Sequence, residues 1–77
     1  MAFPSKTLVE TVWHDKGNRL TIPAGEPVTI VEPVDVRDGE DRRNLLDGID
    51  GYARQGQRFV MIRIRNWFAI MNRKHLA

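Results

Sequence analysis

Apolar and polar residues alternate over three short segments in the first half of the chain. Lys6–Trp13 alternates with a period of about two, which is typical of a strand with one buried face. Arg19–Ile22 and Val28–Glu32 are shorter runs rich in β-branched residues. Turn-forming residues separate the three runs at Asp15–Asn18 and Pro23–Pro27. We therefore predict three strands joined by tight turns.

Residues 33–57 break this pattern and form a connection of 25 residues. A structureless loop of that length is uncommon inside a compact domain, so we predict a short helix within it. Asp38 is the expected N-cap, Asp41 lies in the first turn, and Gly48 is the expected end of the helix. The alternative is a mobile acidic loop anchored by a few leucines.

The apolar pattern of residues 58–72 predicts a β-hairpin with its turn at Arg65-Asn66. In that register Ile64 pairs with Trp67, Ile62 with Ala69, and Val60 with Met71. These six side chains share one face, which we expect to be the core.

The opposite face of this hairpin is also largely apolar, although the solvent face of an antiparallel sheet is usually polar. It carries Phe59, Met61, Arg63, Phe68 and Ile70. We expect the segment 38–52 to cover it with Leu45, Leu46, Ile49 and Tyr52. A second copy of the chain is the alternative cover.

Composition restricts the chain to one small domain, residues 1–77. It has no cysteine, so disulfides and thiolate metal sites are excluded.

No apolar run approaches the ~20 residues of a membrane span, and no signal-peptide pattern opens the chain. We expect a cytoplasmic protein with no membrane contact. Chain length alone also suggests a phage or mobile-element origin, as a conjecture.

The net charge of +2 conceals an uneven distribution. Residues 58–77 carry five Lys or Arg and no Asp or Glu, whereas residues 32–50 carry seven acids and three Arg. The two segments either neutralise each other within the fold, or the basic one forms a surface for nucleic acid or an acidic partner.

Two segments resemble small β-barrels of the Src-homology-3-like type, in its bacterial form. Leu20–Ile30 looks like the diverging turn of that family, and Ala69–Leu76 looks like its closing segment. The resemblance implies an all-β, SH3-like barrel of about five strands, with a short helix in the 33–57 insert. The insert is longer than the usual connection. The aromatic residues that bind proline-rich ligands in other members are not matched, so that activity is not carried over.

A second resemblance concerns Asp15–Pro23, which looks like the Gly-Arg-x-x-Ile-Pro strand of AbrB-type DNA-binding regulators. In that family a short helix follows the Ile-Pro pair. Here Ala24-Gly25-Glu26 follows at once. This resemblance implies a DNA-binding dimer and is the weaker of the two.

Basic and aromatic side chains are interleaved near the C-terminal end of the sequence. Such a mixture suits phosphate contact and base stacking, but it also suits a hairpin kept soluble by arginines. The candidate binding residues are Arg63, Arg65, Trp67, Phe68, Arg73, Lys74 and His75. Trp13 is a further candidate, either in a binding surface or closing one end of the barrel.

Catalytic and metal-binding patterns are missing from the sequence. His14 and His75 are the two histidines and Ser5 is the single serine, so neither a metal site nor a nucleophilic triad is predicted. The acids of residues 38–50 lack the spacing of a calcium-binding loop. We predict no catalytic residue, no metal and no cofactor.

The sequence therefore favours a small non-enzymatic interaction module that binds a protein partner or itself. The alternative is nucleic-acid binding through the basic C-terminal hairpin. A third, weaker hypothesis is a small enzyme whose site forms on the symmetry axis of an oligomer.

Overall fold

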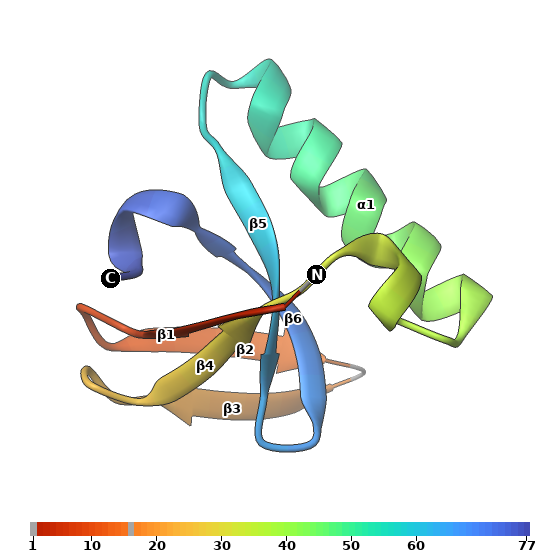
Figure 1. Ribbon diagram of the computed structural model, residues 1–77. Coiled ribbons are helices and arrows are strands. Elements are labelled where there is room, and N and C mark those ends of the chain that lie inside the picture. The colour runs from red at the N-terminus through yellow and green to blue at the C-terminus, as the bar shows by residue number, and fades with distance from the viewer. Residues whose placement is uncertain (1, 16) are drawn as a thin grey trace.

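The computed structural model describes residues 2–15 and 17–77. Within them the fold is mostly β, with one α-helix (Figure 1). The elements, in chain order, are β1 (Phe3–Lys6), β2 (Thr11–Asp15), β3 (Asn18–Ile22), β4 (Pro27–Ile30), α1 (Gly39–Arg54), β5 (Phe59–Ile64) and β6 (Trp67–Asn72). Short 3-10 helices span Pro33–Asp35 and Arg73–His75.

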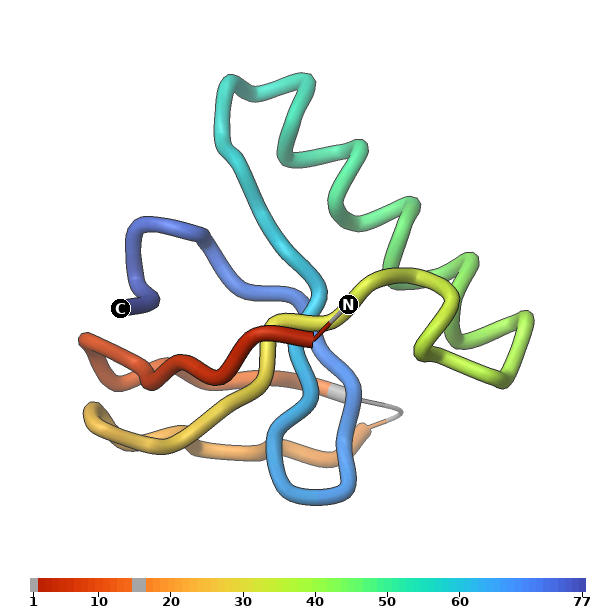
Figure 2. Tube along the Cα trace, in the orientation of Figure 1, coloured from red at the N-terminus to blue at the C-terminus, as the bar shows by residue number. Residues whose placement is uncertain are grey.

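The strands form two antiparallel sheets. The larger sheet has the strand order β1-β4-β5-β6, and the smaller one is the β2–β3 hairpin. Between the two sheets lies a hydrophobic cluster that includes Ile22, Ile62 and Ile64. Helix α1 lies along the opposite face of the larger sheet (Figures 1 and 2). The larger sheet is therefore covered on both faces, which explains why its hairpin is apolar on both.

The predicted single strand Lys6–Trp13 is wrong, because two strands occupy this region. β1 ends at Lys6 and pairs with β4, whereas β2 begins at Thr11 and pairs with β3. The chain bends between them, where Leu8 and Val9 are exposed in spite of their apolar side chains. The alternation continues through the bend, so the pattern alone does not reveal that the chain changes sheets.

Thr7 fixes this bend. It is the one polar residue in the described part of the chain that is buried, at 1% exposure. Its hydroxyl donates to the carbonyl of Pro23 (2.7 Å) and accepts from the N–H of Glu26 (2.9 Å). Its backbone N–H donates to the Glu26 carbonyl (3.0 Å), and its carbonyl accepts from the N–H of Gly25 (2.7 Å). Four hydrogen bonds thus join the bend to the turn between β3 and β4.

The C-terminus lies against the same bend. Thr7 forms an isolated bridge with Leu76. The N–H of Leu8 donates to the carbonyl of His75 (2.7 Å), and that of Ala77 donates to the carbonyl of Lys6 (3.0 Å). The first and last segments of the described chain are therefore joined side by side.

The predicted hairpin is confirmed in position and register. Ile64 pairs with Trp67, Ile62 with Ala69 and Val60 with Met71. The six side chains of the predicted core face all belong to, or pack against, the cluster between the two sheets.

The predicted helical cover is also confirmed, in place of the mobile loop. Leu45 is buried with Val36, Met61 and Ile70, and Leu46 and Ile49 pack beside them. The Tyr52 ring stacks on Phe59 with centroids 3.8 Å apart. Among the described residues, no helix is long and apolar enough to span a membrane.

The start of α1 follows the prediction, but its end does not. The Asp38 carboxylate accepts from the N–H groups of Glu40 (2.9 Å) and Asp41 (3.0 Å), as expected of an N-cap. Gly48 does not end the helix, which continues to Arg54. A Cβ at Gly48 would lie 2.8 Å from Cδ1 of Ile70, so this glycine marks a close approach of helix to sheet.

We predict that alanine at the two glycines inside α1 has unequal effects. Each substitution removes the same helix penalty of about 1 kcal/mol. The new methyl group of Gly51→Ala meets no atom within 4 Å, so its free energy of unfolding should rise by that amount. Gly48→Ala must displace Ile70, so its free energy of unfolding should rise by less. Urea unfolding followed by tryptophan fluorescence measures both. Equal gains would show that the helix does not lie tightly on β6.

We predict that Thr7→Val destabilises the fold by about 2–3 kcal/mol, because two partly buried polar groups lose their partner. Thr7→Ser keeps the hydroxyl and should cost only about 1 kcal/mol for the lost methyl group. The same urea titration compares them. If the two variants were equally stable, the hydroxyl would have no role in holding the bend.

Candidate functional site

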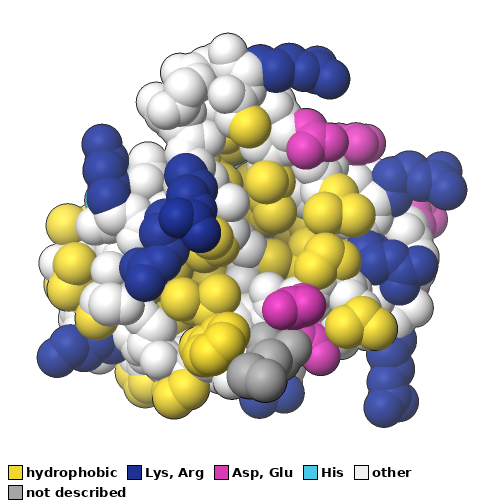
Figure 3. All heavy atoms as spheres, turned by 45° about the horizontal axis from the view of Figure 1, so that its top comes forward, with side chains coloured by type: hydrophobic (Ala, Val, Ile, Leu, Met, Phe, Trp, Pro, Cys, Tyr) yellow, Lys and Arg dark blue, Asp and Glu magenta, His cyan; other side chains and the backbone are white. Residues whose placement is uncertain are grey.

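The hairpin separates the predicted basic and aromatic residues into two groups. Arg63, Arg65, Trp67 and Phe68 lie at or near its turn, whereas Arg73, Lys74 and His75 form the 3-10 helix after β6. Residues 69–72 of β6 lie between the groups, a length of about 13 Å. Figure 3 shows Lys and Arg dispersed around a central hydrophobic band on the face in view. The sequence run from 63 to 75 is therefore not one continuous patch.

Arg65 occupies the hairpin turn with a φ of 53°, a conformation that side-chain-bearing residues seldom adopt. Its side chain is half exposed, and Nε donates to Oε1 of Glu26 at 3.1 Å. Glu26 belongs to the turn before β4, not to the acidic segment 32–50. Because the pair is exposed, it contributes about 0–1 kcal/mol to stability.

Arg73 and Lys74 of the second group line a shallow basic depression at the far end of the hairpin, whereas His75 does not. The depression has a volume of about 490 Å³, and its charged lining residues are Arg58, Arg73 and Lys74. Nη1 of Arg73 donates to the carbonyl of Leu76 (3.2 Å), which leaves Arg58 and Lys74 as the more available cations. Arg58 was not singled out from the sequence, although the predicted hairpin register, extended beyond its last pair, brings it next to Arg73.

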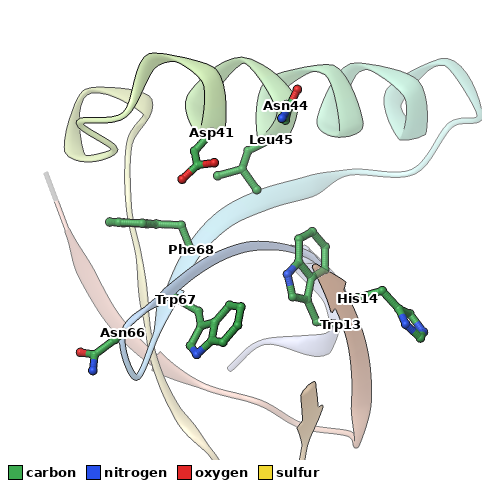
Figure 4. A pocket seen from close by; sticks show the side chains of 8 residues that line it. All are labelled: Trp13, His14, Asp41, Asn44, Leu45, Asn66, Trp67 and Phe68. Carbon is green, nitrogen blue, oxygen red and sulfur yellow. The ribbon is translucent and has the colours of Figure 1, made fainter. Parts of the chain in front are cut away.

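A larger cavity of about 590 Å³ lies between β2, the first half of α1 and the turn end of the β5–β6 hairpin (Figure 4). We call it the aromatic groove. Its lining residues are Trp13, His14, Asp41, Asn44, Leu45, Asn66, Trp67 and Phe68. Both tryptophans of the chain therefore lie on its wall.

Trp13 holds a central position in this groove. It packs against both hydrophobic clusters, the one between the sheets and the one under α1. Trp13 thus belongs both to the packed interior and to the wall of the groove. Its Nε1 is buried, and no acceptor for it exists among the described residues. In Figure 4 the nitrogen-bearing edge of the indole faces the space shared with Trp67 and Phe68.

Trp67 and Phe68 approach the groove from opposite faces of β6. Trp67 is half-buried against the cluster between the sheets, as its register predicts. It also lines a smaller cavity of about 330 Å³ with Trp13, Asn18, Arg19 and Leu20. Phe68 packs against the cluster under α1. Two neighbouring residues of one strand therefore contribute aromatic surface to the same groove.

Sequence reasoning missed the polar wall of the groove. Asp41 and Asn44 lie on α1 together with Leu45, at the i, i+3, i+4 spacing of one helix face. From the sequence, Asp41 is expected only as a residue of the first helical turn. Its carboxylate has no ion pair or hydrogen bond within the described part of the chain. The helical spacing of Asp41 and Leu45 was the signal that could have placed it beside the sheet.

Comparisons with protein-family models, curated proteins and solved structures gave no match to this chain. Over residues 2–15 and 17–77, no group of three or more His, Asp or Glu side chains is arranged to hold a metal ion.

Proposed function

We propose that this protein is a small interaction module and that its aromatic groove docks a segment of a partner protein. The observation that carries the proposal is Trp13, whose indole N–H is buried beside the groove with no acceptor in the described structure. An unpaired buried donor costs about 1–3 kcal/mol. A carbonyl supplied by a partner would recover part of that cost when docking turns the indole and exposes its N–H.

The size and lining of the groove support the same proposal. Ligand pockets are typically ~300–1,000 Å³, mostly apolar, with a few polar groups that fix orientation. The groove falls in this range and combines Trp13, Trp67, Phe68 and Leu45 with two amides and one carboxylate. Tryptophan is also enriched among the residues that contribute most to binding at protein interfaces.

We further propose that the two sheets form an incompletely closed SH3-like barrel. Its support is the pairing of the C-terminal segment with Lys6–Leu8, together with the tight turn that joins β3 directly to β4. The strand number is then six instead of five, because the first predicted strand is divided at Thr7. In this arrangement the groove lies where β2 and β6 separate.

A random peptide library should test docking directly. We expect selected peptides to bind the wild-type protein and to bind Asn44→Tyr at least ~10-fold more weakly, a loss of about 1.4 kcal/mol, because the new ring fills the groove. The matched control is Ala53→Tyr, which adds the same ring on an exposed part of α1 outside the groove. Isothermal titration calorimetry measures each affinity.

Equal binding to the two variants, or no selected peptide at all, would contradict docking in the groove. Light scattering of the wild-type protein over a range of concentrations tests the other occupant, a second copy of the chain. A mass that rises with concentration in the wild type and in Ala53→Tyr, but not in Asn44→Tyr, would assign the groove to self-association.

The second candidate function is nucleic-acid binding, and its support is the basic depression. Arg58, Arg73 and Lys74 converge there from two segments of the chain, which is the arrangement a phosphate backbone requires. None of the described residues that line this depression is aromatic, so its contribution would be phosphate contact without base stacking.

We predict that any oligonucleotide affinity falls between ~50 and ~200 mM salt and depends on the basic depression. Arg58→Glu/Lys74→Glu should abolish it. Arg63→Glu/Arg65→Glu, which makes the same charge change near the turn, should weaken it far less. Fluorescence anisotropy with labelled single- and double-stranded oligonucleotides measures both. If Arg63→Glu/Arg65→Glu weakened binding more than Arg58→Glu/Lys74→Glu, the nucleic-acid site would lie at the hairpin turn instead. If the protein bound no oligonucleotide at low salt, this candidate function would be excluded.

A further inference from the structure

The charge of the aromatic groove indicates what kind of segment it would hold. We infer that the docked segment carries a lysine or arginine side chain, with its cationic group at Asp41 and its carbon stem across Trp67 and Phe68. This inference rests on the proposed docking function and specifies its ligand.

Asp41 is the one formally charged side chain among the described residues that line the groove, with His14 taken as neutral. Its backbone N–H is occupied by Asp38, but its carboxylate is without a partner in the described structure. A carboxylate at the rim of a half-apolar cavity attracts a cation and disfavours an anion. Because Asp41 is exposed, this ion pair alone would be weak.

The aromatic walls supply the rest of the attraction. Lysine and arginine side chains consist of an apolar stem and a charged end, and they lay the stem on apolar surface. A cation near the face of a tryptophan or phenylalanine ring gains about 0.5–2 kcal/mol from the ring quadrupole. Trp13, Trp67 and Phe68 line the same space as Asp41 (Figure 4). One side chain can therefore meet both the rings and the carboxylate.

The other described charges near the groove do not reverse this preference. Arg19 lines the smaller cavity with Trp13 and Trp67 but does not line the groove itself. Arg65 is paired with Glu26, and Arg42 donates to the carbonyl of Val36 (2.9 Å). The N-terminus of α1 carries a partial positive charge of about half a unit. The two negative charges of Glu40 and Asp41 in the first turn exceed it. Arg63 lies across from Phe68 in the sheet register but does not line the groove.

The unpaired N–H of Trp13 favours a peptide over a small free cation. A metal or ammonium ion offers no acceptor to an N–H donor. A peptide supplies a carbonyl every residue, so a basic side chain and an acceptor for Nε1 arrive on the same segment, provided that docking turns the indole and exposes this buried N–H. The ligand class is therefore an exposed basic peptide segment.

Three blocked single amino acids test this inference: the N-acetyl, N'-methylamide forms of arginine, lysine and citrulline. Citrulline has the shape of arginine without its charge. We expect the arginine and lysine probes to shift the Trp13 indole N–H resonance saturably in two-dimensional ¹H–¹⁵N NMR. The citrulline probe should bind about fivefold more weakly, a difference of ~1 kcal/mol.

The matched variants are Asp41→Asn and Glu40→Gln. Both remove one negative charge from the first turn of α1, so both lose the same interaction with the helix dipole. Asp41 lines the groove and Glu40 does not. Asp41→Asn should weaken the arginine probe about fivefold, and Glu40→Gln less than twofold. Unchanged resonances elsewhere in the spectrum establish that each variant is folded.

The outcomes separate this inference from the docking proposal. If citrulline binds as well as arginine, or if the two variants behave alike, the preference for a cation is wrong. If library peptides bind in the groove but carry no excess of Lys or Arg, the docking proposal is supported and the inferred preference for a basic side chain is wrong. If neither peptides nor probes perturb the Trp13 indole, both proposals fall.

Discussion

The bend at Thr7 is where the parts of this fold that are most distant in sequence meet. The Thr7 hydroxyl is its one buried polar side-chain group. It bonds to Pro23 and Glu26 at the turn between β3 and β4, while the backbone on either side of it pairs with the C-terminal segment. The chain can change from the larger sheet to the smaller one at this point because the buried polar groups of Thr7 all have protein partners. The relative position of the two sheets is thus set at this end of the molecule.

The opposite end is where the groove forms. At that end, among the described residues, no strand of the β2–β3 hairpin pairs with a strand of the β5–β6 hairpin. Trp13 fills the space between them and contacts the cores on both sides of the larger sheet. A large indole can seal such a junction, but no described group accepts from its N–H. The hydrogen bonds of Thr7 fix one end of the two sheets. The other end keeps a partly apolar groove beside the unpaired N–H of Trp13.

Local sequence patterns predicted the elements that local interactions determine. The register of the β5–β6 hairpin follows from apolar alternation around a two-residue turn, and the N-cap of α1 follows from Asp38. The break at Thr7 and the continuation of α1 past Gly48 were not predictable in this way. Thr7 needs partners about 16–19 residues away, and Gly48 is explained by its approach to Ile70 of β6. Both are consequences of tertiary packing, which overrides residue propensity.

The candidate site shows the same division. Trp13, Trp67 and Phe68 were identifiable as large aromatic side chains, whereas Asp41 and Asn44 became relevant only when α1 was laid across the sheet. The two sets also differ in energetics. Trp13 supports both hydrophobic clusters, so its loss would affect folding and binding together. Asp41 and Asn44 are exposed and belong to neither cluster, so changes there alter the groove with little effect on the core. Ligand preference can therefore vary through the helix while the aromatic walls stay fixed by the fold.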